Sequence, residues 1–126
     1  MKVKNVTIGI KSIEEVLNKT KDVMERLERG EKVKKRKPGI YFESLNVMRK
    51  AITHERLKIL KVIKEKHPAS IYELAKLLNR NLKNVSDDVH YLAELGLIEL
   101  EKGKSNGREK TTPIVGYDKI LLEIPV

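Results

Sequence analysis

A run of polar side chains between residues 80 and 90 carries the groups most suited to chemistry in this sequence. It combines guanidinium, ammonium, amide, hydroxyl, carboxylate and imidazole groups, which proteins use to contact the phosphates and base edges of double-stranded DNA. The alternative is that these side chains form an ordinary solvated helix face. The residues of this run that we predict to contact DNA are Arg80, Lys83, Asn84, Ser86, Asp87 and His90.

Two adjacent acids, Asp87 and Asp88, interrupt this run in a chain with a net charge of +9. At 100° per residue on a helix, Asp88 borders the face that points to the core, whereas Asp87 points outward. We therefore expect Asp88 to serve the structure, by accepting backbone N–H groups or by pairing with a basic group. Asp87 could accept a hydrogen bond from cytosine N4 in a major groove, or it could simply be solvated. The core-facing residues are Val85, Val89 and Leu92, with Leu82 and Ala93 beside them.

Two further sets of basic residues could bind phosphates. Residues 1–52 hold 14 of the 27 lysines and arginines but only 7 of the 18 acids, a net charge of +7. Their densest basic run is a connector at 31–37, for which the alternative is a linker with no partner. The second set lies in a predicted hairpin, where the alternative is charge that serves solubility. The predicted contacts are Lys34, Lys35, Arg36 and Lys37 in the connector and Lys102, Lys104, Arg108 and Lys110 in the hairpin.

The sequence gives little support for catalysis or for a bound metal. It contains no Cys, which excludes disulfides and Cys-based zinc sites. His54, His67 and His90 lie far apart and lack the spacing of metal ligands. No Ser-His-Asp set and no glycine-rich phosphate loop is indicated. We therefore expect no enzyme activity, no metal and no cofactor.

The sequence also predicts a cytoplasmic protein that does not bind membranes. It has no apolar run of 18 residues, and its first residues alternate in character without the long apolar region of a signal peptide. The abundance of Lys and Glu, together with the absence of Gln, Cys and Trp, is typical of a thermophilic protein.

Caps and stops divide the C-terminal part of the chain into three helices and a hairpin. Thr53, Ser70 and Asn81 can each cap the start of a helix, and Gly96 can end the last one. Two short helices joined by a tight turn and followed by a hairpin make a winged helix-turn-helix, whose second helix can enter a major groove. The predicted elements are helices at 53–67, 71–78 and 82–95, strands at 97–102 and 110–117 around a loop at 103–108 with an Asn-Gly turn, and a last strand at 119–124.

The N-terminal part is predicted to be a strand over 2–10 and an amphipathic helix over 12–29. Ser12 and Glu15 form a capping box at the start of this helix, and Gly30 is the expected stop. Its continuous apolar stripe indicates a dimer interface or an intramolecular core, because its polar face mixes acids and bases instead of being basic as in a membrane helix. A short β-prone segment at 40–44 and a brief helix at 44–51 follow.

The fold class expected from these elements is α+β, with a winged helix-turn-helix and an N-terminal strand-helix extension. We assign residues 1–39 to a dimerisation segment and residues 40–126 to a DNA-binding domain. The helix at 53–67 is apolar on several faces, with only a polar strip left for water, so we expect it to pack between the C-terminal module and the N-terminal part.

Residues 40–124 resemble the MarR-like winged helix-turn-helix regulators, and in particular a small archaeal and bacterial class of predicted transcriptional regulators. That class has an F-E-S entry, an L-T-x-x-R helix start and an R-D-x-K-x-V-x-x-D-V-x-x-L recognition helix. One departure is Asn81, which replaces an acid and keeps the capping role. The matching residues are Phe42-Glu43-Ser44, Ile52-Thr53-His54-Glu55-Arg56, Arg80-Asn81-Leu82-Lys83-Asn84-Val85, Asp88-Val89 and Leu92.

This resemblance implies a sequence-specific DNA-binding transcriptional regulator, more commonly a repressor. We expect a homodimer through residues 1–30, which would hold two recognition helices about one DNA turn, ~34 Å, apart. Two alternatives stay open. The first is an antitoxin-like DNA-binding protein whose N-terminal part also binds a partner toxin. The second is a winged-helix module that serves only protein interaction.

Overall fold

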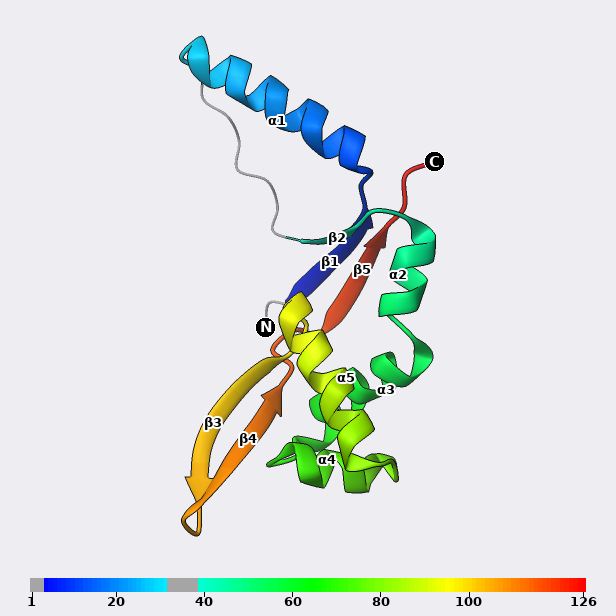
Figure 1. Ribbon diagram of the computed structural model, residues 1–126, viewed down its shortest axis with the longest axis vertical. Helices are drawn as coiled ribbons and strands as arrows, with labels where there is room; N and C mark the ends of the chain where they lie inside the picture. Colours follow the sequence, from blue (N-terminus) through cyan, green and yellow to red (C-terminus); the bar gives the residue numbers. More distant parts are fainter. Residues whose placement is uncertain (1–3, 32–38) are drawn as a thin grey trace. The chain divides into compact units, whose positions relative to one another are not determined.

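The computed structural model describes residues 4–31 and 39–126, which form an α+β fold of helices and two small sheets (Figure 1). The chain divides into two compact units. Unit 1 consists of Met1–Ala51 together with Lys119–Val126, and unit 2 is the continuous segment Ile52–Asp118.

Unit 1 is built around a parallel sheet of three strands in the order β2-β1-β5. The central strand β1 (Asn5–Ile10) pairs with β2 (Ile40–Phe42) on one side and with β5 (Lys119–Glu123) on the other. The predicted first and last strands are therefore confirmed, the first of them from Asn5 onward. The parallel pairing of β1 with β5 joins segments more than a hundred residues apart in the sequence.

The units do not divide at the predicted boundary between residues 39 and 40. β2 and α2 (Leu45–Ala51) belong to unit 1, and so does β5. The reason is the pairing of β1, which forms five register pairs with β5 and three with β2. The segment that we predicted as one DNA-binding domain therefore contributes its two ends to the N-terminal unit.

Helix α1 (Ile13–Glu28) begins and ends where the sequence predicts. Ser12 Oγ accepts a hydrogen bond from the Glu15 N–H at 3.1 Å, and Gly30 adopts φ of 78° just beyond the last turn. Yet none of the 16 residues of this helix is buried. The buried apolar residues described in unit 1 come from the sheet and α2 instead, namely Ile8, Phe42, Met48 and Ala51.

Unit 2 contains the three predicted helices, α3 (His54–Lys66), α4 (Ile71–Leu78) and α5 (Leu82–Leu95). All three predicted caps are formed, because Thr53, Ser70 and Asn81 each accept from the backbone N–H three residues later at 3.1–3.2 Å. α5 ends as predicted at Gly96, with φ of 90° and a 2.9 Å hydrogen bond from the Leu97 N–H to the Leu92 carbonyl.

The core of unit 2 confirms how the sequence sorts the faces of α5, because Val85, Val89 and Leu92 are each 0% exposed. Unit 2 by itself covers α3 only in part. This helix buries Ile59, Leu60 and Ile63 within the unit, whereas Leu57 remains 42% exposed. Within unit 2, α3 is therefore covered on one face.

The strands of the hairpin, β3 (Glu99–Ser105) and β4 (Arg108–Ile114), lie closer to the turn than predicted. Only Asn106 and Gly107 remain in the turn, both with positive φ, at 53° and 77°. This is the two-residue turn whose twist matches that of the strands, so pairing continues through most of the predicted loop. Two side chains attach the hairpin end to the helices, since Thr112 Oγ1 donates to the Ala69 carbonyl and the Tyr117 hydroxyl donates to the Leu97 carbonyl.

Candidate nucleic-acid interface

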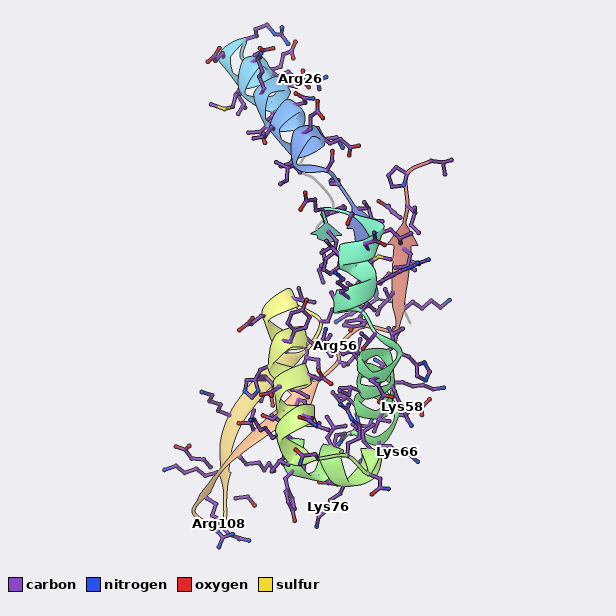
Figure 2. All side chains as sticks on the ribbon, turned by 45° about the vertical axis from the view of Figure 1, so that its right-hand side comes forward. Arg26, Arg56, Lys58, Lys66, Lys76 and Arg108 are labelled. Atoms are coloured by element: carbon purple, nitrogen blue, oxygen red, sulfur yellow. The ribbon has the colours of Figure 1, made fainter. Side chains whose placement is uncertain are left out.

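An ion cluster around Asp88 fixes α5 against the rest of unit 2. Oδ1 of Asp88 lies 3.2 Å from Nε of Arg56 on α3, and its Oδ2 lies 3.1 Å from Nη2 of Arg80 in the α4–α5 turn. The side chains are only 17–26% exposed, so water screens these contacts weakly. The guanidinium of Arg56, on the side of α3 toward α5 in Figure 2, also lies 4.1 Å from the ring centre of Tyr91. The structural role predicted for Asp88 is confirmed.

Arg80 is held in this cluster instead of lying with the other predicted DNA contacts. Besides Asp88, its Nε lies 3.9 Å from the carboxylate of Glu55. Its Nη1 is buried and has no hydrogen-bond partner among the described residues. A guanidinium held by these contacts supports the packing of α5.

Sequence reasoning missed Arg56 as a member of this site. Arg56 and Asp88 both stood in the motifs of the resemblance, 32 positions apart, but nothing in the sequence joined them. The pair could have been found from its position on the helices. Each of the two charged residues lies at the edge of the buried face of its helix, and an acid at such an edge requires a basic partner. Arg56, Arg80 and Asp88 all belong to the motifs of the resemblance, and together they form one cluster of ion pairs.

The exposed face of α5 carries most of the remaining predicted contacts. Lys83, Asn84, Asp87 and His90 are exposed, and Ser86 is half-buried. Nδ1 of His90 lies 2.7 Å from the carbonyl oxygen of Ser86, one helical turn earlier. A carbonyl oxygen can only accept, so a proton on Nδ1 of His90 would be donated to Ser86.

A hollow of about 420 Å³ separates α5 from the hairpin. Lys102 and Lys104 are two residues apart on β3, so their side chains share one face of the strand. Four predicted contacts from three elements line the hollow, but the hairpin register puts Lys102 and Lys104 on the same strand face as Glu109, and puts Lys110, which pairs with Gly103, on the other face. The residues that line the hollow are His90, Lys102, Gly103, Lys104, Glu109, Lys110 and Thr111.

The remaining predicted basic contacts are Arg108 and the four connector residues. Arg108 is exposed beside the turn, at the far end of the hairpin in Figure 2. It does not line the hollow. The connector residues Lys34, Lys35, Arg36 and Lys37 lie outside the described residues.

Across 4–31 and 39–126, no three His, Cys, Asp or Glu side chains lie close enough together to hold a metal ion. Over the same ranges, no helix combines the length and apolar character needed to cross a bilayer.

Comparison with known proteins places unit 2 within a family. A stretch of 50 residues, 40% of the chain, is 44% identical to the uncharacterized protein MJ0241 of Methanocaldococcus jannaschii. This stretch covers 33% of that curated relative, so the chain spans about a third of its length. The sequence pattern of the HVO_A0114 family matches residues 51–122, which include α3, α4, α5 and the whole hairpin. With more than half of its length matched, the chain belongs to the HVO_A0114 family.

Proposed function

We propose that this protein is a sequence-specific DNA-binding transcriptional regulator in which unit 2 acts as a winged helix-turn-helix. The observation that carries the proposal is the hollow between α5 and the hairpin. His90 of α5 lines it together with Lys102 and Lys104 of β3 and Lys110 of β4. A helix face with hydrogen-bonding groups next to a basic hairpin suits a duplex, whose bases and phosphates lie side by side.

The dimensions of α5 support insertion into a major groove. Its 14 residues make a rod about 21 Å long, and the major groove is about 12 Å wide. One face of α5 is used by the core, and the opposite face presents Lys83, Asn84 and Asp87. Among residues 4–31 and 39–126, no hydrogen bond or ion pair to these three side chains would prevent them from reaching base edges.

The charges of α5 and of the hairpin suit different contributions to DNA binding. The exposed face of α5 mixes Lys83 with Asp87 and Glu94, so it would attract phosphates weakly and discriminate between bases. The hairpin strands carry Lys102, Lys104, Arg108 and Lys110 against Glu99, Glu101 and Glu109, with the cations toward the turn. The hairpin would therefore supply attraction that is independent of sequence.

The exposed stripe of α1 supports binding as a dimer. Ile13, Leu17, Met24 and Leu27 are each 59–64% exposed. A second copy that covers this stripe would join two α5 helices in one dimer, as binding to two half-sites requires. Repression by occupying a promoter is the mode that we propose.

Selection of bound sequences from a random pool of DNA duplexes tests this function. The full chain is expected to enrich one sequence, and Asp87→Ala is expected to change which base is preferred at one position. Enrichment of no sequence, with equal binding to all duplexes, would exclude sequence-specific regulation and favour a protein-interaction module.

A second candidate function rests on the same exposed stripe of α1. As in an antitoxin, α1 could bind a different protein instead of a second copy. The solution mass of the purified chain separates these candidates. A dimer at micromolar concentration supports self-association, and a monomer together with a neighbouring gene for a small toxin supports the partner protein.

A further inference from the structure

We infer that the outer edge of β5 is a contact with a second copy of this chain. At this contact the β5 strands of two copies pair antiparallel and join their three-stranded sheets into one continuous sheet. The inference goes beyond the proposed function, because it requires no DNA and uses a different surface from the apolar stripe of α1.

β5 is an edge strand whose outward backbone groups are available for pairing. The sheet order β2-β1-β5 gives its outer side no neighbouring strand within residues 4–31 and 39–126 (Figure 1). The Lys119 N–H donates to the Lys4 carbonyl at 3.4 Å, so every second residue of β5 from Lys119 onward directs its backbone groups at β1. The N–H and C=O groups of Ile120 and Leu122 therefore face outward, as a further strand requires.

The middle of β5 is apolar on both faces of the sheet. Leu121 is 45% exposed and Leu122 is 57% exposed, and as neighbours in a strand they point to opposite faces. Edge strands are commonly protected by a charged residue or a proline within the strand, and residues 120–122 include neither. This edge is therefore a suitable template for the addition of a strand.

The side chains of β5 are complementary to the same strand read in reverse. The strand is Lys119-Ile120-Leu121-Leu122-Glu123, with a cation at one end, an anion at the other and apolar residues between them. Antiparallel pairing centred on Leu121 sets Lys119 opposite Glu123 of the second copy and Ile120 opposite Leu122 of the second copy. A two-fold axis repeats both pairs, so the contact closes after two copies.

The backbone geometry is compatible with this register. Residues with outward backbone groups must oppose one another in an antiparallel ladder, and the register centred on Leu121 opposes Ile120 to Leu122 in this way. A shift by one residue would oppose outward groups to inward ones. A shift by two would set Lys119 or Glu123 opposite Leu121, so neither charge would meet its opposite.

The other edge of the sheet is a poorer partner for β5. β2 is only three residues long, Ile40–Phe42, and carries no charge to oppose Lys119 or Glu123. Pairing of β5 with β2 of another copy would also join two different surfaces, and such contacts continue into open filaments unless they form a ring. Charge and closure therefore both favour β5 against β5.

The first experiment measures the dissociation constant of the full chain by sedimentation over a wide range of concentration, because a strand pair covers less area than a standard interface. Lys119→Glu opposes like charges at both ends of the contact and should weaken the dimer about tenfold or more. Glu123→Lys should do the same. Lys119→Glu combined with Glu123→Lys restores opposite charges and should return the dissociation constant to the wild-type value.

The matched control is Lys66→Glu, an exposed residue of α3 that changes the net charge as Lys119→Glu does and should leave the dimer unchanged. A wild-type chain that stays monomeric at every concentration would overturn the inference. A combined variant that dimerises as weakly as the two single variants would also overturn it.

The second experiment uses cross-linking in a chain that contains no Cys. Leu121→Cys places two thiols across the two-fold axis, where a pair without mutual hydrogen bonds has its Cα atoms about 4.5 Å apart, within reach of a disulfide. Leu122→Cys is the control, because its two copies lie diagonally at about 7–8 Å, beyond that reach. Mild oxidation should link the first variant into a dimer and leave the second unlinked. Equal linking of both variants, or of neither, would overturn the inference.

A third measurement separates this contact from α1 and from DNA binding. The Leu121→Cys cross-link should still form when Leu17→Asp is added to disrupt the stripe of α1. Loss of the dimer in Leu17→Asp, with no effect of either charge reversal, would assign dimerisation to α1 and overturn the inference. A β5 dimer that enriches no DNA sequence would support the inference and exclude the proposed function.

Discussion

Unit 2 and unit 1 differ in how completely they bury their helices. In unit 2, α3, α4 and α5 each bury three or more residues, and the middle of the core is 0% exposed at Leu74 and Val89. In unit 1, α1 is the longest helix of the described chain and buries none of its 16 residues. Unit 2 buries the apolar faces of its helices, whereas unit 1 leaves the apolar stripe of α1 exposed.

The difference teaches that a strong local helix signal does not guarantee intramolecular packing. α1 has a cap, a stop and an apolar stripe, but a single helix of this length is only marginally stable in water without a surface to pack against. The buried core of unit 2 supports the proposal that this unit is a rigid element for DNA recognition. The exposed stripe of α1 supports an element for association.

The largest expected contrast between the units is in the response to truncated leucines. Leu74→Ala removes a side chain that is 0% exposed and should lower the free energy of unfolding by about 3 kcal/mol or more. Leu17→Ala, at 64% exposure, should change it by less than about 0.5 kcal/mol at a concentration where the chain is monomeric. Denaturant unfolding measures both, and equal losses would show that α1 packs within its own chain.

The next contrast concerns ion pairs. Asp88→Asn leaves two partly buried guanidinium groups without their shared acid and should cost about 2–3 kcal/mol. Asp22→Asn removes a pair with Arg26 on α1 whose side chains are 51–54% exposed, and should cost under about 0.5 kcal/mol. Thermal unfolding at low and high salt compares the variants. Equal stability of both would contradict the structural role of Asp88.

A smaller contrast concerns tyrosines and alkaline pH. Burial raises the pKa of Tyr117 to about 12, above the usual value of 10.0. The neutral phenol is therefore favoured by folding, so its contribution is complete below pH 10 and is lost as pH rises toward 12. Tyr117→Phe should flatten this loss and remove the 2.9 Å hydrogen bond to Leu97, at about 1 kcal/mol. Tyr41→Phe in unit 1 is the control. If the free energy of unfolding fell equally steeply between pH 10 and 12 in both variants, this role of Tyr117 would be contradicted.

The smallest contrast concerns the glycines that end α5 and α1. Gly96→Ala forces a side chain into φ of 90° and should cost about 1 kcal/mol in global unfolding. Gly30→Ala faces the same penalty at φ of 78°, but it should fray α1 and leave the unfolding midpoint of unit 2 unchanged. Calorimetry measures the unfolding midpoints of the two variants. Equal shifts of the midpoint would contradict this expectation and would show that α1 packs into the core.

The sequence predicts the local features of both units and misses the distant ones. The caps at Ser12, Thr53, Ser70 and Asn81 and the ends at Gly30 and Gly96 depend on a few neighbouring residues, and all of them formed. The pairing of β1 with β5 depends on partners more than a hundred residues apart, and the sequence has no signal for it. The predicted boundary after residue 39 was misplaced for this reason.

The candidate site shows the same limit. Helical angles identify the outward face of α5, and turn chemistry identifies a hairpin. Angles along one helix cannot show that Arg80 turns toward Asp88 or that Arg56 joins them, because these contacts depend on the crossing of α3 and α5. The meeting of His90 with the lysines of the hairpin depends on tertiary packing in the same way.

The most direct test of the central claim measures the preference of α5 for its selected duplex over a scrambled one. Lys83→Ala combined with Asn84→Ala should bring the ratio of the two affinities close to one, without changing the thermal midpoint. Lys66→Ala combined with Asn46→Ala, a pair of exposed residues, should keep the wild-type ratio. An unchanged ratio in the Lys83 and Asn84 variant would contradict the account, because the outward face of α5 would then not read DNA.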